Sequence, residues 1–322
     1  MSIKDTFVRV KKQLQALIDG RTNSPQNTET PKRQIAQPQE PWYWFFRSSW
    51  GTVWMQYNGK ERIDDTFPWK LHVFASSIED YEQIAQPIAE ALHRLNVSFK
   101  TIDFKYDDSN LHAILDAYDA NGNPNSQYGK AFTIYFNDAE SMYRIAKYID
   151  TLCTSYYHIG RTDNCEMLEF DKHNLGTEKQ YGKSGRVFYR AERDINGEYI
   201  YADDARKINP KQPHNPYNLP DPIQQGIEQD QKDFAFIVAH MSVLNLDEGK
   251  FAIEPGYEDE MIAILERHMP QLWQEKTPDG CIEFQSGLSG IYTVAFFDGL
   301  KDYVKYINLL NKVKSKKQSQ KS

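Results

Sequence analysis

Apolar and polar residues recur with the spacing of strands and helices through the centre of the chain. Four segments have the alternation or β-branched and aromatic enrichment typical of strands, namely residues 69–75, 97–104, 132–136 and 185–193. Helical spacing places Ile84, Ile88 and Leu92 on one face within residues 80–95, and a second helix is indicated around residues 142–152. The pattern predicts an α+β fold, with a mixed sheet and flanking helices.

One proline interrupts the first of these helical patterns. Pro87 lies in the middle of residues 80–95. An interior proline lacks the amide hydrogen and clashes with the preceding turn, at a cost of about 3 kcal/mol. We therefore expect this helix to be kinked, or to begin one turn later than its apolar pattern suggests.

Composition divides the chain into five parts. In order, these are a flexible N-terminal extension (1–40) with a short helix within residues 2–20, the main domain (41–209), a proline-rich connector (210–230), a smaller α/β segment (231–310) and a basic tail (311–322). The smaller segment contains a possible repeat, because residues 292–298 and the following helix resemble residues 132–138 and theirs. Either a degenerate duplication or the general similarity of strand-to-helix units accounts for this.

Charge and cysteine content exclude several classes of function. The 322 residues include 38 Lys and Arg against 45 Asp and Glu, a net charge of -7, which argues against a general nucleic-acid partner. No segment has the about 18 to 20 uninterrupted apolar residues of a membrane span, and no apolar signal sequence is evident. The three cysteines, Cys153, Cys165 and Cys281, form no CxxC pair, so we expect neither a disulfide framework nor a metal site.

Basic side chains recur on the predicted strands. Strand alternation places Lys70 and His72 on one face of residues 69–75, and Lys100 lies in an apolar segment that can lower its pKa. Lys130 and Tyr135 lie at the mouth and on a face of the third strand, respectively. The fourth strand adds a row of arginines, Arg186, Arg190 and Arg193. If these strands share one sheet, several cations converge on one histidine.

Such a cluster indicates an anionic ligand. Guanidinium groups match the geometry of phosphate oxygens, so phosphate is the simplest candidate. The sequence has no glycine-rich phosphate loop, no HExxH and no GxSxG. The usual templates for nucleotide binding, zinc proteolysis and serine hydrolysis therefore do not apply.

The motifs resemble, in their order, those of the phosphothreonine lyase family. They are KLHVFA at 70–75, FK at 99–100, GKAFTIY at 129–135 and YR at 189–190. The family includes type III secretion effectors and the lyase domains of class III and IV lanthipeptide synthetases, and the GKAFTIY motif is closer to the lanthipeptide branch. The resemblance spans residues 69–193, which is less than half of the chain.

This resemblance implies metal-independent and cofactor-independent β-elimination of phosphate. Phosphothreonine would become dehydrobutyrine, and phosphoserine would become dehydroalanine. By position, Lys100 matches the general base that removes the Cα proton, and His72 matches the general acid that protonates the leaving phosphate. Lys70 matches a lysine that stabilises charge on the carbonyl, Tyr135 lines the site, and Arg190 grips the phosphate.

Other positions depart from the family pattern. Asn125 stands where the effectors carry an arginine, and we expect Lys130 to substitute as a point charge. Arg193 is the nearest match to a second distal arginine, and Arg186 is a further candidate for phosphate binding. Two alternatives stay open: a non-catalytic phosphopeptide-binding module, and an interaction protein whose basic residues are surface charges.

The implied partner is a phosphorylated peptide or protein, made by a separate kinase upstream. Neither a nucleic acid nor a membrane is expected as a partner. The site of action would be the bacterial cytoplasm or, for a secreted effector, a host cell.

Overall fold

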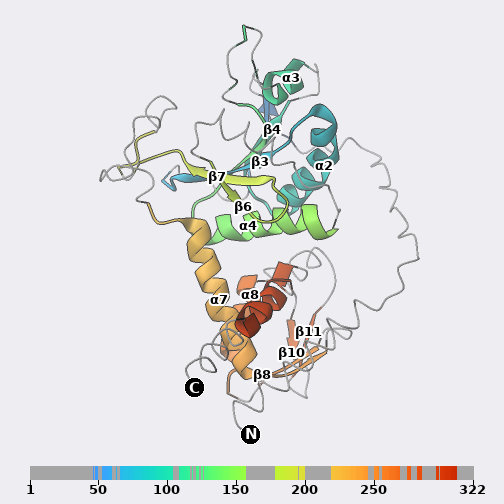
Figure 1. The fold of residues 1–322 in the computed structure, drawn as a ribbon, viewed down its shortest axis with the longest axis vertical. Helices are drawn as coiled ribbons and strands as arrows, with labels where there is room; N and C mark the ends of the chain where they lie inside the picture. The colour runs from blue at the N-terminus through green and yellow to red at the C-terminus, as the bar shows by residue number, and fades with distance from the viewer. Residues whose placement is uncertain are drawn as a thin grey trace, which may run out of the picture. The chain divides into compact units, whose positions relative to one another are not determined.

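The computed structural model describes most of the predicted strands and helices. It covers residues 46, 48–49, 53–59, 63, 66–103, 109–116, 118, 121–122, 125, 127–156, 178–194, 196–199, 219–245, 250–253, 256–268, 274–276, 281–284, 295–296 and 298–309. The chain forms two compact units, and the described residues up to 226 belong to one and those from 227 onward to the other (Figure 1). The expected extension at 1–40, the expected basic tail at 311–322 and residues 210–218 of the expected connector lie outside the described residues.

The first unit contains a seven-stranded sheet in the order β1-β2-β4-β5-β3-β7-β6. Its strands are β1 (Ser48–Ser49), β2 (Trp54–Tyr57), β3 (Trp69–Phe74), β4 (Phe99–Ile102), β5 (Lys130–Tyr135), β6 (Lys179–Tyr181) and β7 (Val187–Ala191). The α+β class is confirmed. However, the described pairings are all antiparallel, so the expectation of a mixed sheet is wrong.

The connectivity explains this difference. Helix α2 (Ile78–Arg94) links β3 to β4, and both strands run antiparallel to β5, which lies between them. Strands β3 and β4 therefore run in the same direction, but β5 separates them and they do not form a parallel pair. The core order β4-β5-β3-β7 with helices α2 and α4 (Ala139–Thr151) is the split β-α-β arrangement called ferredoxin-like. Helix α3 (Ser109–Leu115) lies in the connection from β4 to β5.

Helix α2 runs without interruption through its proline. Ser77 caps it by accepting a hydrogen bond from the amide of Asp80, so the helix begins earlier than expected and Pro87 lies inside it. Tyr81, Ile84 and Ile88 are buried on its sheet side, and the Tyr81 hydroxyl lies 2.9 Å from Thr101 Oγ1 on β4. Burial of this apolar face offsets the cost of the interior proline.

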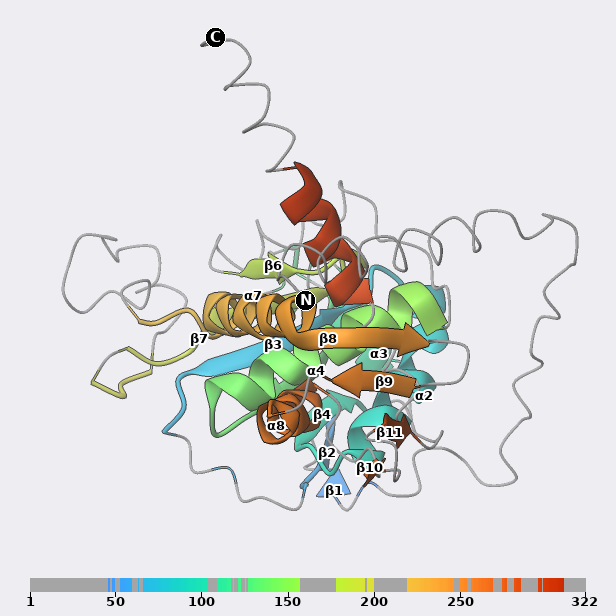
Figure 2. The same cartoon turned by 90° about the horizontal axis from the view of Figure 1, so that it is seen from below.

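Helix α4 covers the same face of the sheet. Asp138 caps it by accepting from the amide of Ser141, and the π-turn η2 (Leu152–Tyr156) continues it. It packs against β3 and β7 (Figure 2). Leu71, Val73 and Phe132 are fully buried on this helix-covered face. Because side chains alternate along a strand, Lys70 and His72 lie on the opposite face, which we call the site face.

The second unit combines helices with a four-stranded antiparallel sheet in the order β10-β11-β9-β8. Its elements are α7 (Pro222–His240), β8 (Met241–Asn245), β9 (Lys250–Ile253), α8 (Glu258–His268), β10 (Gln274–Lys276), β11 (Cys281–Phe284) and helical residues 298–309. Helix α7 begins in the first unit and includes residues 222–230, which were expected to be a connector. Within the described parts of both units, no helix combines the length and apolar character that a membrane crossing requires.

The described residues of the possible repeat do not match their counterparts. Ala295 and Phe296 are helical, whereas their counterparts Tyr135 and Phe136 are the last residue of strand β5 and the residue that follows it. A repeat would also set residues 238–240 against residues 70–72, but His240 is the last residue of α7, whereas His72 lies in strand β3. At these positions the two segments therefore do not share a local structure.

Candidate functional site

Five basic side chains from four strands come together on the site face. They form what we call the basic cluster: Lys70, His72, Lys100, Lys130 and Arg190. Strand register produces this arrangement, because Lys70 pairs with Arg190 on one side and with Tyr135 on the other. His72 pairs with Thr133, which in turn pairs with Lys100. Paired residues of antiparallel strands point to the same face, so these side chains are neighbours.

A β-bulge brings Lys130 to the site face. The register between β3 and β5 shifts after Val73, so that Phe74 pairs with Lys130 and not with Ala131. Regular alternation from Phe132 would have placed the Lys130 side chain on the helix-covered face of the sheet. The extra residue of the bulge places it on the site face instead. Lys130 is only 3% exposed. Burial and the nearby Arg190 lower the pKa of its ammonium group to about 7.

His72 is held by a buried carboxylate. The side chains of His72 and Glu178 are 2% and 0% exposed, and His72 Nδ1 lies 2.9 Å from Glu178 Oε1. Burial tends to raise the pKa of the Glu178 carboxyl, but His72, Arg190 and Lys130 hold it below its ordinary value. An ionised carboxylate can only accept hydrogen bonds, so Nδ1 donates and Nε2 is left for a ligand. Burial lowers the pKa of His72, and the charge of Glu178 opposes this.

The replacement Glu178→Gln is expected to lower the pKa of His72 further. Glutamine keeps the size of the side chain but removes the negative charge that favours the imidazolium. NMR titration of the histidine ring protons measures the change, and His112, whose side chain is 59% exposed, provides an internal reference that should not move. An unchanged or higher pKa of His72 would show that the pair does not exist in solution.

Arg190 contacts two carboxylates. Its Nη2 lies 3.4 Å from Glu192 Oε1, and its Nε lies 3.6 Å from Glu178 Oε1. Glu192 also forms an ion pair with Lys70. Arg190 Nε is buried and has no hydrogen-bond acceptor among the described residues. Because a buried donor is costly when it is unsatisfied, this nitrogen is a suitable contact for an oxygen of a ligand.

Lys100 lies at the other side of the cluster. Its Nζ is 4.6 Å from the centre of the Trp54 ring, a cation-π contact that favours the ammonium form. Burial and the charge of Lys70 nevertheless lower the pKa of Lys100, while Glu192 opposes this. The cluster thus contains two lysines whose basicity is reduced, and a neutral lysine can accept a proton.

Aromatic rings border the cluster near Lys70. Lys70 Nζ lies 4.8 Å from the centre of the Tyr135 ring and 5.9 Å from that of Tyr199. The guanidinium group of Arg193 also stacks on the Tyr199 ring, with its central carbon 3.9 Å from the ring centre. Arg193 Nη1 donates a hydrogen bond to the Gly197 carbonyl at 2.8 Å. Tyr135 is therefore next to the cluster, whereas Arg193 is tied into the adjoining turn at its border.

Arg186 is not brought into the cluster. Strand β7 begins only at Val187, so the expected alternation of Arg186 with Arg190 does not extend to it. Its guanidinium instead pairs with Asp80 at the start of α2, with Nη1 2.7 Å from Oδ2 and Nη2 2.6 Å from Oδ1. We therefore assign Arg186 a structural role, in place of the phosphate contact expected from the sequence.

Sequence reasoning missed both carboxylates of the site. Glu192 follows Arg190 by two residues, and the alternation used for the arginines could have placed it on the same face. Glu178 lies outside every motif, and no local pattern marks it.

Asn125, which stands where the effectors carry an arginine, donates to the carbonyls of Ala113 and Asp116 at the end of α3, at 2.7 and 2.9 Å.

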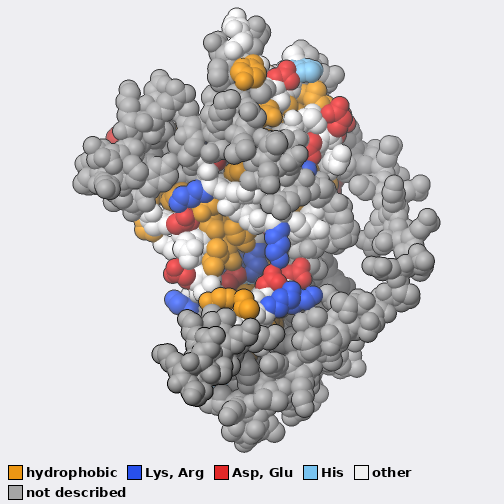
Figure 3. All heavy atoms as spheres, in the orientation of Figure 1, with side chains coloured by type: hydrophobic (Ala, Val, Ile, Leu, Met, Phe, Trp, Pro, Cys, Tyr) orange, Lys and Arg blue, Asp and Glu red, His pale blue; other side chains and the backbone are white. Residues whose placement is uncertain are grey.

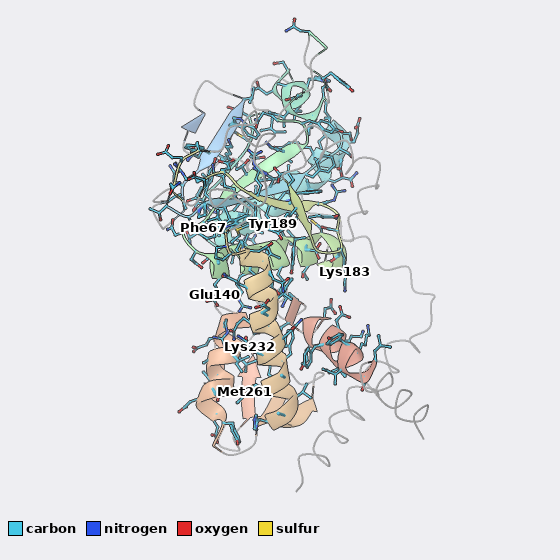
Figure 4. All side chains as sticks on the ribbon, turned by 60° about the vertical axis from the view of Figure 1, so that its left-hand side comes forward. Phe67, Glu140, Lys183, Tyr189, Lys232 and Met261 are labelled. Atoms are coloured by element: carbon cyan, nitrogen blue, oxygen red, sulfur yellow. The ribbon has the colours of Figure 1, made fainter. Side chains whose placement is uncertain are left out.

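Other contacts anchor the sheet edge beside the site. Tyr189 on β7 lies beside the first turn of α7 (Figure 4), where its hydroxyl donates to Asp221 Oδ2 at 3.0 Å. Lys179 on β6 donates to the same oxygen at 2.9 Å. Asp221 also accepts from the amide of Ile223 and thereby caps α7. These contacts hold β6 and β7 against the start of α7, and they thereby fix the position of the strand that carries Arg190.

One group among the described residues has the composition of a metal site, and it belongs to the second unit. Asp230, Asp233 and His268 are buried and close together, with His268 Nε2 2.9 Å from Asp233 Oδ2 and 3.6 Å from Asp230 Oδ1. However, Arg267 also binds Asp233, at 3.0 and 3.1 Å. A cation already paired with the main carboxylate makes an internal ion-pair network the better interpretation.

Neither the protein-family models nor the curated proteins contain a match to the sequence of this chain. The functional argument therefore depends on the geometry of the site and on the motif resemblance. On the face that Figure 3 shows, basic and acidic side chains of the described residues lie side by side, and no broad area of one charge sign is visible.

Proposed function

We propose that the protein is a phosphothreonine or phosphoserine lyase that removes phosphate from a peptide or protein by β-elimination. The convergence of the basic cluster on one sheet face, around a histidine held by a carboxylate, carries this proposal. A surface that binds an anion needs cations alone. A histidine with a buried partner and lysines of reduced pKa are groups that can also move protons.

In the proposed reaction, Lys100 in its neutral form takes the Cα proton of the phosphorylated residue. The electron pair of the Cα–H bond forms the Cα–Cβ double bond, and the Cβ–O bond breaks. The phosphate leaves with the electron pair of that bond, and His72 Nε2 donates a proton to it. Lys70 stabilises the negative charge that develops on the substrate carbonyl. Arg190 and Lys130 bind the phosphate oxygens, and no water is consumed.

The charge state of His72 changes with substrate in this scheme. In the free protein burial keeps the pKa of His72 low, so the neutral form is favoured. A phosphate group carries about -1.5 to -2 charges at neutral pH, and its arrival next to Nε2 favours the imidazolium. Glu178 stabilises that imidazolium from the Nδ1 side. His72 would therefore become an acid when there is a phosphate to protonate.

Mass spectrometry of a phosphothreonine peptide incubated with the protein tests the proposal. Loss of H3PO4 in the presence of a chelator, without loss by the Lys100→Ala variant, is the expected result. A phosphotyrosine peptide serves as a control, because its phosphate cannot leave by β-elimination. Loss of HPO3, which regenerates threonine, would indicate a phosphatase and contradict the mechanism.

A second function, phosphopeptide binding without catalysis, is favoured by one observation. The Trp54 ring beside Lys100 Nζ stabilises the ammonium form, which cannot act as a base. A phosphothreonine peptide that binds to the protein and keeps its mass would support this function over the lyase.

A further inference from the structure

The protein places one of its own carboxylates among the cations of the cluster. Glu192 forms an ion pair with Lys70, and its Oε1 lies 3.4 Å from Arg190 Nη2. Its charge also acts on Lys100 and Lys130. The same side chain interacts electrostatically with His72. Glu192 thus interacts with all five members of the cluster, as a bound anion would.

The two carboxylates of the site differ in their surroundings. The Glu178 side chain is fully buried behind His72, whereas the Glu192 side chain is 16% exposed. Glu192 follows the last residue of β7, and its amide still donates to the Pro68 carbonyl at 2.8 Å. Its backbone is therefore fixed by the sheet, while its side chain lies at the solvent side. Rotation about its side-chain bonds can remove the carboxylate from the cluster without any change in the sheet.

We propose that Glu192 occupies the phosphate position of the free protein and is displaced when substrate binds, so that it determines which anions the site accepts. This inference rests on the proposed function, because it takes the substrate phosphate as the displacing anion. A carboxylate carries one negative charge and two acceptor atoms. A phosphate monoester carries about -1.5 to -2 charges and three acceptor oxygens. A phosphate can therefore replace the tethered carboxylate at Lys70 and Arg190, whereas a free carboxylate, with the same charge as Glu192, cannot.

Anion titration of the full chain tests this selection. The variant Glu192→Gln removes the internal charge, and Glu198→Gln, an exposed glutamate in the next turn, makes the same charge change outside the cluster. Isothermal titration calorimetry with inorganic phosphate and with acetate, at constant ionic strength, measures binding. We expect Glu192→Gln to bind phosphate about tenfold more tightly than wild type and to gain acetate binding, since an opposing charge has gone. Glu198→Gln should behave as wild type.

A folding control accompanies the titration. Removing Glu192 leaves Lys70 and Arg190 without this counter-charge, so the variant is expected to unfold at a lower temperature than wild type. Added phosphate should raise the unfolding temperature of Glu192→Gln by more than that of wild type. This difference can be measured even if the variant is less stable.

Weaker or unchanged phosphate binding by Glu192→Gln would overturn the inference, because Glu192 would then serve to position Lys70 and Arg190. Absence of phosphate binding in both proteins would overturn it as well. The elimination assay separates these results from the proposed function. Elimination by wild type together with weaker phosphate binding by the variant contradicts only the role of Glu192. Tighter binding by the variant without elimination by wild type contradicts only the lyase mechanism.

Discussion

The replacement Lys100→Ala is expected to lower kcat/KM for phosphothreonine elimination by about a thousandfold. General base catalysis typically contributes about a hundredfold to ten-thousandfold, and this variant removes the proposed base. Burial and the charge of Lys70 lower the pKa of Lys100, which increases the fraction of the protein in which this side chain is neutral and able to act as a base. Steady-state kinetics on a phosphothreonine peptide measures the loss.

Two further variants separate a base from a simple positive charge. Lys100→Arg keeps the charge, but a guanidinium does not deprotonate in proteins, so this variant should be as inactive as Lys100→Ala. Lys183→Ala removes an exposed lysine of the turn between β6 and β7 (Figure 4) and should retain full activity. Substantial activity in Lys100→Arg would show that Lys100 acts through its charge, and Lys130 would then be the remaining lysine of reduced pKa in the cluster.

The replacement Lys130→Met is expected to stabilise the fold by about 4 kcal/mol at and below neutral pH. The pKa of this buried lysine is about 7 in the folded protein. In the unfolded chain it is about 10.4, and each pKa unit corresponds to about 1.4 kcal/mol. Between these values the unfolded state binds more protons, so the free energy of unfolding of wild type rises with pH. Methionine has a similar length and no charge to bury.

Urea unfolding from about pH 6 to about pH 9 measures this effect, since the gain from Lys130→Met should be largest at the acidic end and shrink as wild type becomes more stable. Lys183→Met, which changes an exposed lysine in the same way, should leave stability unchanged at every pH. A Lys130→Met variant no more stable than wild type near pH 6 would mean that Glu178 and Glu192 fully compensate the buried ammonium.

The sequence was sufficient for those parts of the site that depend on local alternation. Lys70 and His72 share a face because they are two residues apart on one strand, and the structure has them so. Strands β3, β4, β5 and β7 and helices α2 and α4 were also recognisable, because the apolar faces of these strands and helices are buried against one another. Strands β1, β2 and β6 and helix α3 were not predicted. Pro87 did not stop α2, since packing of the helix outweighs the local preference of one residue.

The remaining features depend on contacts between distant segments. Insertion of β5 between β3 and β4 makes the described sheet antiparallel, and no local pattern predicts it. The bulge at Ala131 decides the direction of Lys130, although the sequence around it reads as a regular strand. Glu178 reaches His72 across 106 positions of the chain. The sequence pattern predicted that Arg186 belongs to the same strand as Arg190, but β7 begins one residue after Arg186.

The position of β3 between β5 and β7 also affects how the chain can be made. Synthesis proceeds from the N-terminus, so β3, β4 and β5 leave the ribosome before β7, which ends at Ala191. Until then β3 has one unpaired hydrogen-bonding edge, and such edges invite pairing with other chains. A nascent chain released before Val187, where β7 begins, would present this edge together with Lys70 and His72, and it would lack Arg190. Premature termination would therefore give an aggregation-prone product rather than a partly active one.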